Sequence, residues 1–100
     1  MENDKYYEIV RLAHYWLRLG GPKLSQRDLY NGWQLFFPNG ADVVQHDYSY
    51  GHEEGCVEFA GLPIDDLNYC AIPLEKAKEI IETFFDELNE TYWQITKSVI

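Results

Sequence analysis

The chain has 100 residues, with 17 Asp or Glu against 8 Lys or Arg, and a formal net charge of −9. This length predicts a single acidic domain over residues 1–100, and a 46% hydrophobic and 16% aromatic content argues against intrinsic disorder. The negative charge argues against DNA, RNA or an anionic membrane as a direct partner, and no apolar run approaches the ~20 residues that span a bilayer.

The first predicted element is a helix over residues 4–19. Apolar side chains recur there every three or four residues, at Tyr6, Ile9, Val10, Ala13, Trp16 and Leu17. The Gly20-Gly21-Pro22 sequence ends the helix, because glycine supplies a left-handed cap and proline cannot continue it. Ser25 and Asp28 are spaced as in a capping box, which predicts a short helical turn over 26–31.

The middle of the chain has the short apolar and β-branched runs of strands, separated by polar turn residues such as Pro38-Asn39-Gly40. The predicted strands are 33–37, 42–48, 56–60 and 67–72. Because the connections between them are short, neighbouring strands are expected to pair antiparallel.

A long helix is predicted over 74–97, after Pro73, because apolar residues again recur every three or four positions. The predicted fold class is therefore α+β: a four-stranded, mainly antiparallel sheet flanked by an N-terminal helix and a long C-terminal helix. The element order is α-β-β-β-β-α, and both helices are expected to cover one face of the sheet.

Charge is unevenly distributed along the chain. Residues 28–75 contain nine acids and no Lys or Arg, and the final helix carries a row of five acids at Glu75, Glu79, Glu82, Asp86 and Glu90. A solvated helix face is one explanation of the second feature, and a row of carboxylates that stands in for phosphates is the other. The outward negative field favours a basic partner surface. Tyrosine side chains next to carboxylates are natural interface anchors. The candidate partner-binding residues are Asp42, Asp47, Tyr48, Tyr50, Glu53, Glu54, Glu58, Asp65 and Asp66.

Catalytic and metal-binding patterns are weak. His46, His52, Glu54 and Cys56 lie close in sequence, but none of the paired spacings of zinc ligands is present, and no catalytic motif is recognised. We therefore expect no enzyme activity, no metal and no cofactor. Cys56 and Cys70 are expected to be buried, reduced thiols, although adjacent strands leave a disulfide open, and reduced thiols indicate the cytoplasm.

One segment resembles a known group of proteins. Phe37-Pro38-Asn39-Gly40, then Asp42-Val43-Val44, then Tyr50-Gly51 with Glu54-Gly55 and Glu58, is similar to a pattern in small uncharacterised acidic α+β proteins of phages and prophages. The resemblance covers about a quarter of the chain and includes no catalytic signature. It implies a mobile-element setting, in which small acidic proteins often inhibit host defence enzymes, as anti-CRISPR proteins do.

Three functions are consistent with these observations. The first is a non-enzymatic acidic protein that occupies the basic, nucleic-acid-binding surface of a host defence complex such as CRISPR machinery. The second is a homo-oligomeric accessory or immunity-type protein, a homodimer for example, that pairs through its C-terminal helix. The third is a small hydrolase or metal protein that uses His46, His52 and Glu54.

Overall fold

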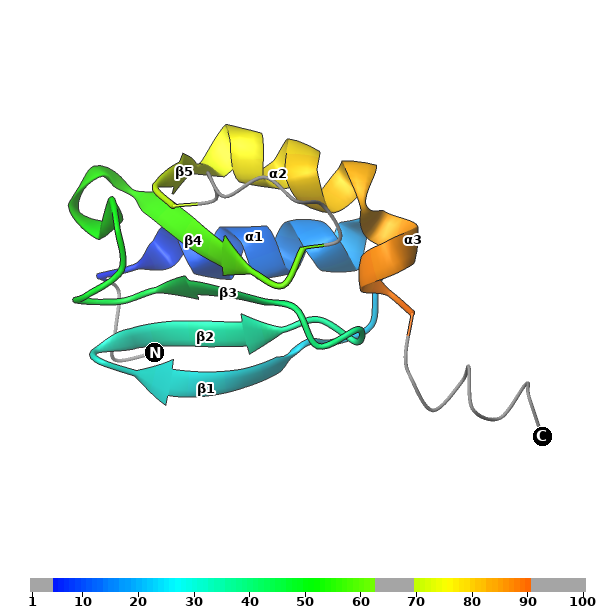
Figure 1. The fold of residues 1–100 in the computed structure, drawn as a ribbon, viewed down its shortest axis with the longest axis horizontal. Coiled ribbons are helices and arrows are strands. Elements are labelled where there is room, and N and C mark those ends of the chain that lie inside the picture. The colour runs from blue at the N-terminus through cyan, green and yellow to red at the C-terminus, as the bar shows by residue number, and fades with distance from the viewer. Residues whose placement is uncertain (1–4, 63–69, 91–100) are drawn as a thin grey trace.

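The computed structural model describes residues 5–62 and 70–90, which form two main helices packed on a five-stranded antiparallel sheet (Figure 1). The elements are α1 (Tyr7–Arg18), β1 (Ser25–Leu29), β2 (Gly32–Phe36), β3 (Asp42–Gln45), the 3-10 helix η1 (His52–Glu54), β4 (Cys56–Ala60), β5 (Ile72–Pro73), α2 (Leu74–Thr83) and α3 (Phe85–Leu88). The strands lie side by side in chain order, so every connection joins neighbours. The α+β class and the antiparallel pairing are confirmed.

The sheet has five strands where four were predicted, because residues 25–29 form β1 and not a helical turn. β1 pairs with β2 along its whole length, from Ser25 opposite Phe36 to Leu29 opposite Gly32. Only Tyr30 and Asn31 connect them, and both have positive φ angles, of 47° and 63°. Two residues in this conformation match the twist of a hairpin, so pairing with β2 overrides the helical signal of Ser25 and Asp28.

Two other predicted strands are shorter than expected. β3 ends at Gln45, three residues before the predicted end, because the chain turns at His46, where Ser49 Oγ accepts a hydrogen bond from the His46 backbone N–H at 3.0 Å. The last strand contains only Ile72 and Pro73 among the described residues, and 67–69 of the predicted strand lie outside them.

The C-terminal helix is interrupted at Phe84, whose backbone angles (φ −105°, ψ 23°) are not helical. The interruption lets Phe85 contact Trp16, with ring centroids 4.7 Å apart, and buries Leu88 completely. The carbonyl of Leu88 also accepts a hydrogen bond from the backbone of Asn39 at 3.1 Å. The chain therefore bends at Phe84 so that Phe85 and Leu88 pack on the core. Residues 91–97 of the predicted helix lie outside the described part.

The core lies between the helices and one face of the sheet. Leu35, Val43 and Phe59 lie side by side on β2, β3 and β4 and are buried together with Ile9 and Trp16 of α1. Alternation along a strand sends the next residues to the opposite face. That open face carries a row of Gln34, Val44 and Glu58 and is covered by neither helix.

A buried glutamine joins the sheet to the start of α1. Gln45 is fully buried, its Oε1 accepts a hydrogen bond from the backbone N–H of Ile9 at 3.1 Å, and its Nε2 donates to Glu8 Oε1 at 3.0 Å. The first N–H groups of a helix have no partner within the helix, and the residue before α1, Tyr6, makes no side-chain cap. The strand therefore caps the helix, and this contact fixes where α1 begins relative to β3.

We predict that Gln45→Leu lowers the free energy of unfolding by about 1–3 kcal/mol, because it leaves the N–H of Ile9 buried without a partner. Urea unfolding monitored by circular dichroism measures the change. The control is Gln34→Leu, on the open face, where water replaces the lost hydrogen bonds. An equal effect of both substitutions would contradict the capping role of Gln45.

Candidate functional site

Exposed tyrosines gather at one end of the sheet, where the β1–β2 turn and the β3–β4 connection lie next to each other (Figure 1). The side chains of Tyr30, Tyr48 and Tyr50 are 56%, 75% and 68% exposed, and the rings of Tyr30 and Tyr48 pack edge to face with centroids 4.9 Å apart. Glu53 and Glu54, in the same connection, are also exposed. We call these five residues the Tyr/Glu surface.

The Tyr/Glu surface rests on a tight turn over His46–Ser49. The backbone N–H of Tyr48 donates to Nδ1 of His46 at 3.0 Å, and the Ser49 hydroxyl and backbone both bond to His46. Burial lowers the pKa of His46, which is only 9% exposed. A neutral ring is also what this geometry requires, because Nδ1 must accept a hydrogen bond. The aromatic ring of Tyr48 is thus exposed on a turn whose backbone is internally bonded.

The two glutamates are presented by η1, which is flanked by Gly51 and Gly55, both with φ of 77°. A Cβ on Gly51 would lie 2.7 Å from Cβ of Ala71 and 2.8 Å from Cβ of Cys56, so only glycine fits this left-handed position. The single helical turn between the glycines directs Glu53 and Glu54 to solvent.

Asp47 connects three parts of the chain through its carboxylate. Its Oδ1 accepts hydrogen bonds from Lys5 Nζ at 2.8 Å and from the hydroxyl of Tyr6, and its Oδ2 accepts one from Asn31 Nδ2 at 2.8 Å. The hydrogen bonds that the carboxylate accepts hold the pKa of Asp47 well below its usual range. The bond from Asn31 has the largest effect, followed by those from Lys5 and Tyr6. Because both oxygens are engaged within the chain, Asp47 acts here as a positioning residue for the β1–β2 turn and the β3–β4 connection.

The buried Tyr6 extends this network to η1. Its hydroxyl lies 3.1 Å from Nδ1 of His52, and its single proton is donated to Asp47, so His52 Nδ1 must carry the proton of the second bond. Burial and the bond to Asp47 raise the pKa of Tyr6, which keeps the hydroxyl protonated. His52 is therefore a structural link between α1 and the loop, as His46 is within the turn.

Two further predicted partner-binding residues lie on the open face of the sheet. Asp42 is half-buried on the open face of the sheet, where its Oδ2 accepts a hydrogen bond from Gln34 Nε2 at 2.5 Å. Glu58 is half-buried on the same face and accepts a bond from the backbone of Tyr50 at 3.3 Å. The predicted residues Asp65 and Asp66 lie outside the described part of the chain.

Of the predicted set, Tyr48, Tyr50, Glu53 and Glu54 are exposed in one connection between β3 and β4, and the structure adds Tyr30, whose ring packs against that of Tyr48. Tyr30 is absent from the predicted set because the spacing of Ser25 and Asp28 predicts a helical turn over 26–31. The Asn31-Gly32 pair is a signal for a hairpin at this point, although the two-residue loop itself is Tyr30-Asn31, one residue earlier than an Asn-Gly turn predicts.

The two cysteines are free, but only partly as predicted. Cys56 is half-buried, whereas Cys70 is exposed, so its predicted burial is wrong. Partial desolvation by neighbouring atoms raises the pKa of both thiols, helped by the negative charge of Glu54 at Cys56 and of Glu58 at Cys70. A raised pKa keeps a thiol protonated and weakly nucleophilic. Within residues 5–62 and 70–90 no group of three or more His, Cys, Asp or Glu side chains is placed to hold a metal ion.

Cations gather on the helical side, away from the Tyr/Glu surface. Arg11, Arg18 and Lys78 line a polar hollow of about 340 Å³ on α1 and α2, together with His14 and Tyr15. The carboxylate of Glu82 lies beside this hollow and accepts a hydrogen bond from the Tyr15 hydroxyl at 2.9 Å. The charges of this side are thus mixed, whereas the cation described near the Tyr/Glu surface, Lys5, is ion-paired with Asp47.

A scan against protein-family models, a search of curated proteins and a search of solved structures each gave no match for this chain. The arrangement of the site is therefore the basis for assigning a function. None of the helices in the described part of the chain has the length and apolar character needed to cross a membrane.

We predict that Asp47→Asn destabilises the fold at about pH 7 and that the difference from wild type shrinks as the pH falls below about 4. A carboxyl whose pKa is depressed in the folded state stabilises the fold above its unfolded value, near 3.8, and loses that contribution on protonation. Thermal unfolding between about pH 7 and pH 2.5 measures the difference.

The matched control is Asp28→Asn, an exposed carboxylate on β1. It should leave the melting temperature nearly unchanged at every pH. A difference between Asp47→Asn and wild type that stays constant down to about pH 2.5 would show that the charge of Asp47 is not what stabilises the loop.

Proposed function

We propose that this chain is a non-enzymatic binding protein that uses the Tyr/Glu surface to bind a basic surface on another protein. The observation that carries the proposal is the exposure of three large aromatic side chains, Tyr30, Tyr48 and Tyr50, at the end of the sheet where the β3–β4 connection also exposes Glu53 and Glu54. Tyrosine is enriched among the residues that dominate binding energy at interfaces, because it supplies a large contact area and a polar tip at low entropic cost.

The charges around this surface favour Lys or Arg on the partner. Within the described residues, neither Glu53 nor Glu54 forms an ion pair, and Lys5 is held by Asp47. An arginine from a partner can therefore pair with a glutamate and stack on a neighbouring tyrosine, which combines a charge-assisted hydrogen bond with a cation–π contact.

The hydrogen bonds beneath the Tyr/Glu surface order its loops before a partner binds. Asp47, Tyr6 and His52 connect the loop to α1, and His46 bonds the turn that carries Tyr48. A surface that is already ordered loses less conformational entropy on association. The same residues are engaged in structural hydrogen bonds, which supports binding over a hydrolytic role for His46 and His52.

Within this proposal, the partner is a nucleic-acid-handling protein whose Lys and Arg normally hold phosphates, such as a component of a host defence complex in the cytoplasm. Support comes from the net charge of −9 and from the resemblance of residues 37–58 to small phage and prophage proteins. CRISPR machinery is the example that this resemblance suggests. The alternative of a homodimer that pairs through the C-terminal helix depends on residues 91–97, which lie outside the described part.

We predict that Glu53→Lys combined with Glu54→Lys weakens binding to a fluorescent arginine-rich peptide by about tenfold or more, because it reverses the charge that faces the partner. Fluorescence anisotropy measures the Kd. Binding by the wild type should also weaken steeply as salt rises, since screening shortens the electrostatic reach to about 8 Å at physiological ionic strength.

The control is Asp86→Lys combined with Glu87→Lys, two exposed acids of α3. Both double variants have the same net charge, so a difference between their Kd values reports the position of the charges and not their total. Tyr48→Ala combined with Tyr50→Ala should weaken binding without changing the net charge. Equal effects of the two charge reversals, or full tolerance of the tyrosine changes, would rule out the Tyr/Glu surface as the binding site.

A further inference from the structure

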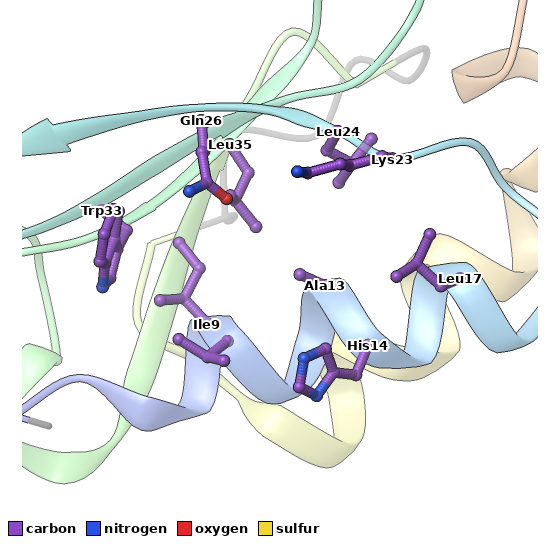
Figure 2. Close-up of a pocket in the computed structure, with 10 residues that line it drawn as sticks. Ile9, Ala13, His14, Leu17, Lys23, Leu24, Gln26, Trp33 and Leu35 are labelled. Carbon is purple, nitrogen blue, oxygen red and sulfur yellow. The ribbon is translucent and has the colours of Figure 1, made fainter. Parts of the chain in front are cut away.

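A second hollow, of about 250 Å³, lies between α1 and the inner face of β1 and β2 (Figure 2). Figure 2 shows Leu35 and Trp33 on the sheet facing Ile9 and Ala13 on α1, with Leu17 closing the far end. We call this hollow the α1–sheet groove. It involves none of the five residues of the Tyr/Glu surface.

The groove exists because two helices cover a sheet of five strands. α1 packs mainly on β3 and β4, and α2 packs mainly on β4 and β5. The inner face of β1 and β2 therefore has α1 at its edge but no helix directly over it. The side of α1 that faces these strands is nevertheless apolar and carries Val10, Ala13 and Leu17. Ala13 contributes only a methyl group to the space between helix and sheet, and Leu17 is 46% exposed. Apolar surface left in contact with water in this way favours an apolar occupant.

The polar residues of the groove select the charge of that occupant. His14, Lys23 and Gln26 line it, and no acidic residue of the described ranges 5–62 and 70–90 does, although acids outnumber Lys and Arg by 17 to 8 in the sequence. Lys23 forms no ion pair with any residue in the described part of the chain. Its ammonium group, which Figure 2 shows on the sheet side of the groove beside Leu24, is therefore available to an anionic group.

The size of the groove limits the ligand. A dry cavity of about 150 Å³ holds one benzene ring, whereas pockets for drug-sized molecules begin at about 300 Å³. A volume of about 250 Å³ suits a ligand of roughly ten non-hydrogen atoms. An apolar chain or ring of this size can lie against Val10, Leu17 and Leu35 while one end reaches Lys23.

We propose that the α1–sheet groove binds a small carboxylic acid with an apolar body, such as a medium-chain fatty acid. The carboxylate pairs with Lys23 and accepts hydrogen bonds from His14 or Gln26, and the apolar body covers the exposed side of α1. This site is independent of the proposed protein-binding function, because it uses different residues and a different side of the molecule.

Titration with octanoate, followed by two-dimensional NMR of the ¹⁵N-labelled protein, tests the proposal. We expect a Kd between about 0.01 and 1 mM for a ligand of this size, with shift changes in α1, β1 and β2. The indole N–H of Trp33 is a further reporter, since Nε1 is buried without a hydrogen-bond partner among the described residues. Octanol, which has the same chain but no charge, should bind about tenfold more weakly.

Two kinds of variant separate the charge from the groove. Lys23→Gln should reduce octanoate affinity to that of octanol and leave octanol affinity unchanged, whereas Lys76→Gln, an exposed lysine on α2, should change neither. Ala13→Leu fills the groove and should abolish binding of both ligands. Leu17→Gln, at a half-exposed position where folding is not at risk, should weaken both several-fold.

Three results would overturn the proposal. One is equal affinity of the wild type for octanoate and octanol. Another is unchanged binding in both Leu17→Gln and a folded Ala13→Leu variant. The third is a set of concentration-dependent shifts in α1, β1 and β2 without any ligand, which would identify the groove as a contact between two copies of the chain.

Discussion

The carboxylate of Asp47 holds together three segments that are distant in the sequence, and the candidate binding surface depends on it. Lys5 and Tyr6 precede α1, Asn31 forms the β1–β2 turn, and Asp47 itself lies in the β3–β4 connection. Other contacts assist it: the backbone N–H of Asp47 donates to the carbonyl of Tyr30 at 3.1 Å, and the Tyr6 hydroxyl lies 3.1 Å from Nδ1 of His52. The carboxylate is nevertheless the group that contacts all three segments at once. A second contact, from buried Gln45 to the start of α1, fixes the helix on the adjacent strand. Together these bonds convert two hairpin loops into one surface with a defined shape.

The molecule is divided into two sides of different chemistry. The loop end of the sheet carries exposed tyrosines and glutamates, whereas Arg11, Arg18 and Lys78 lie on the helices. The helices mix these cations with exposed acids such as Glu75 and Glu79, whereas Glu53 and Glu54 form no ion pair among the described residues, so we place the basic partner at the loop end within the proposal. Between the helix and the first two strands, the shortage of helical cover leaves an apolar groove whose polar residues are basic or neutral. The two features arise from one architecture: five strands, two main helices, and long loops at one end.

Much of the fold follows from periodicity, and the errors have physical causes. Helix α1, strands β2 to β4 and the start of α2 match their predicted positions to within about three residues, because their apolar spacing agrees with their burial. Strand β1 has four exposed residues out of five, so it has no apolar alternation to detect, and its pairing with β2 is a tertiary effect. The interruption at Phe84 likewise accompanies the packing of Phe85 on Trp16, a contact between distant parts of the chain that the local sequence around Phe84 does not reveal. For the site, charge and tyrosine content predicted Tyr48, Tyr50, Glu53 and Glu54, but the internal role of Asp47 required knowing which donors surround it.

Amide hydrogen exchange compared between the wild type and Asp47→Ala tests most directly whether this one carboxylate holds the binding surface in place. The account predicts faster exchange at residues 30–31 and 46–55 in the variant, while strands β2, β3 and β4 keep their protection, because their ladder does not involve Asp47. Unchanged exchange in the two loops would contradict the account. So would faster exchange throughout the sheet, since Asp47 would then support the whole fold and not the surface.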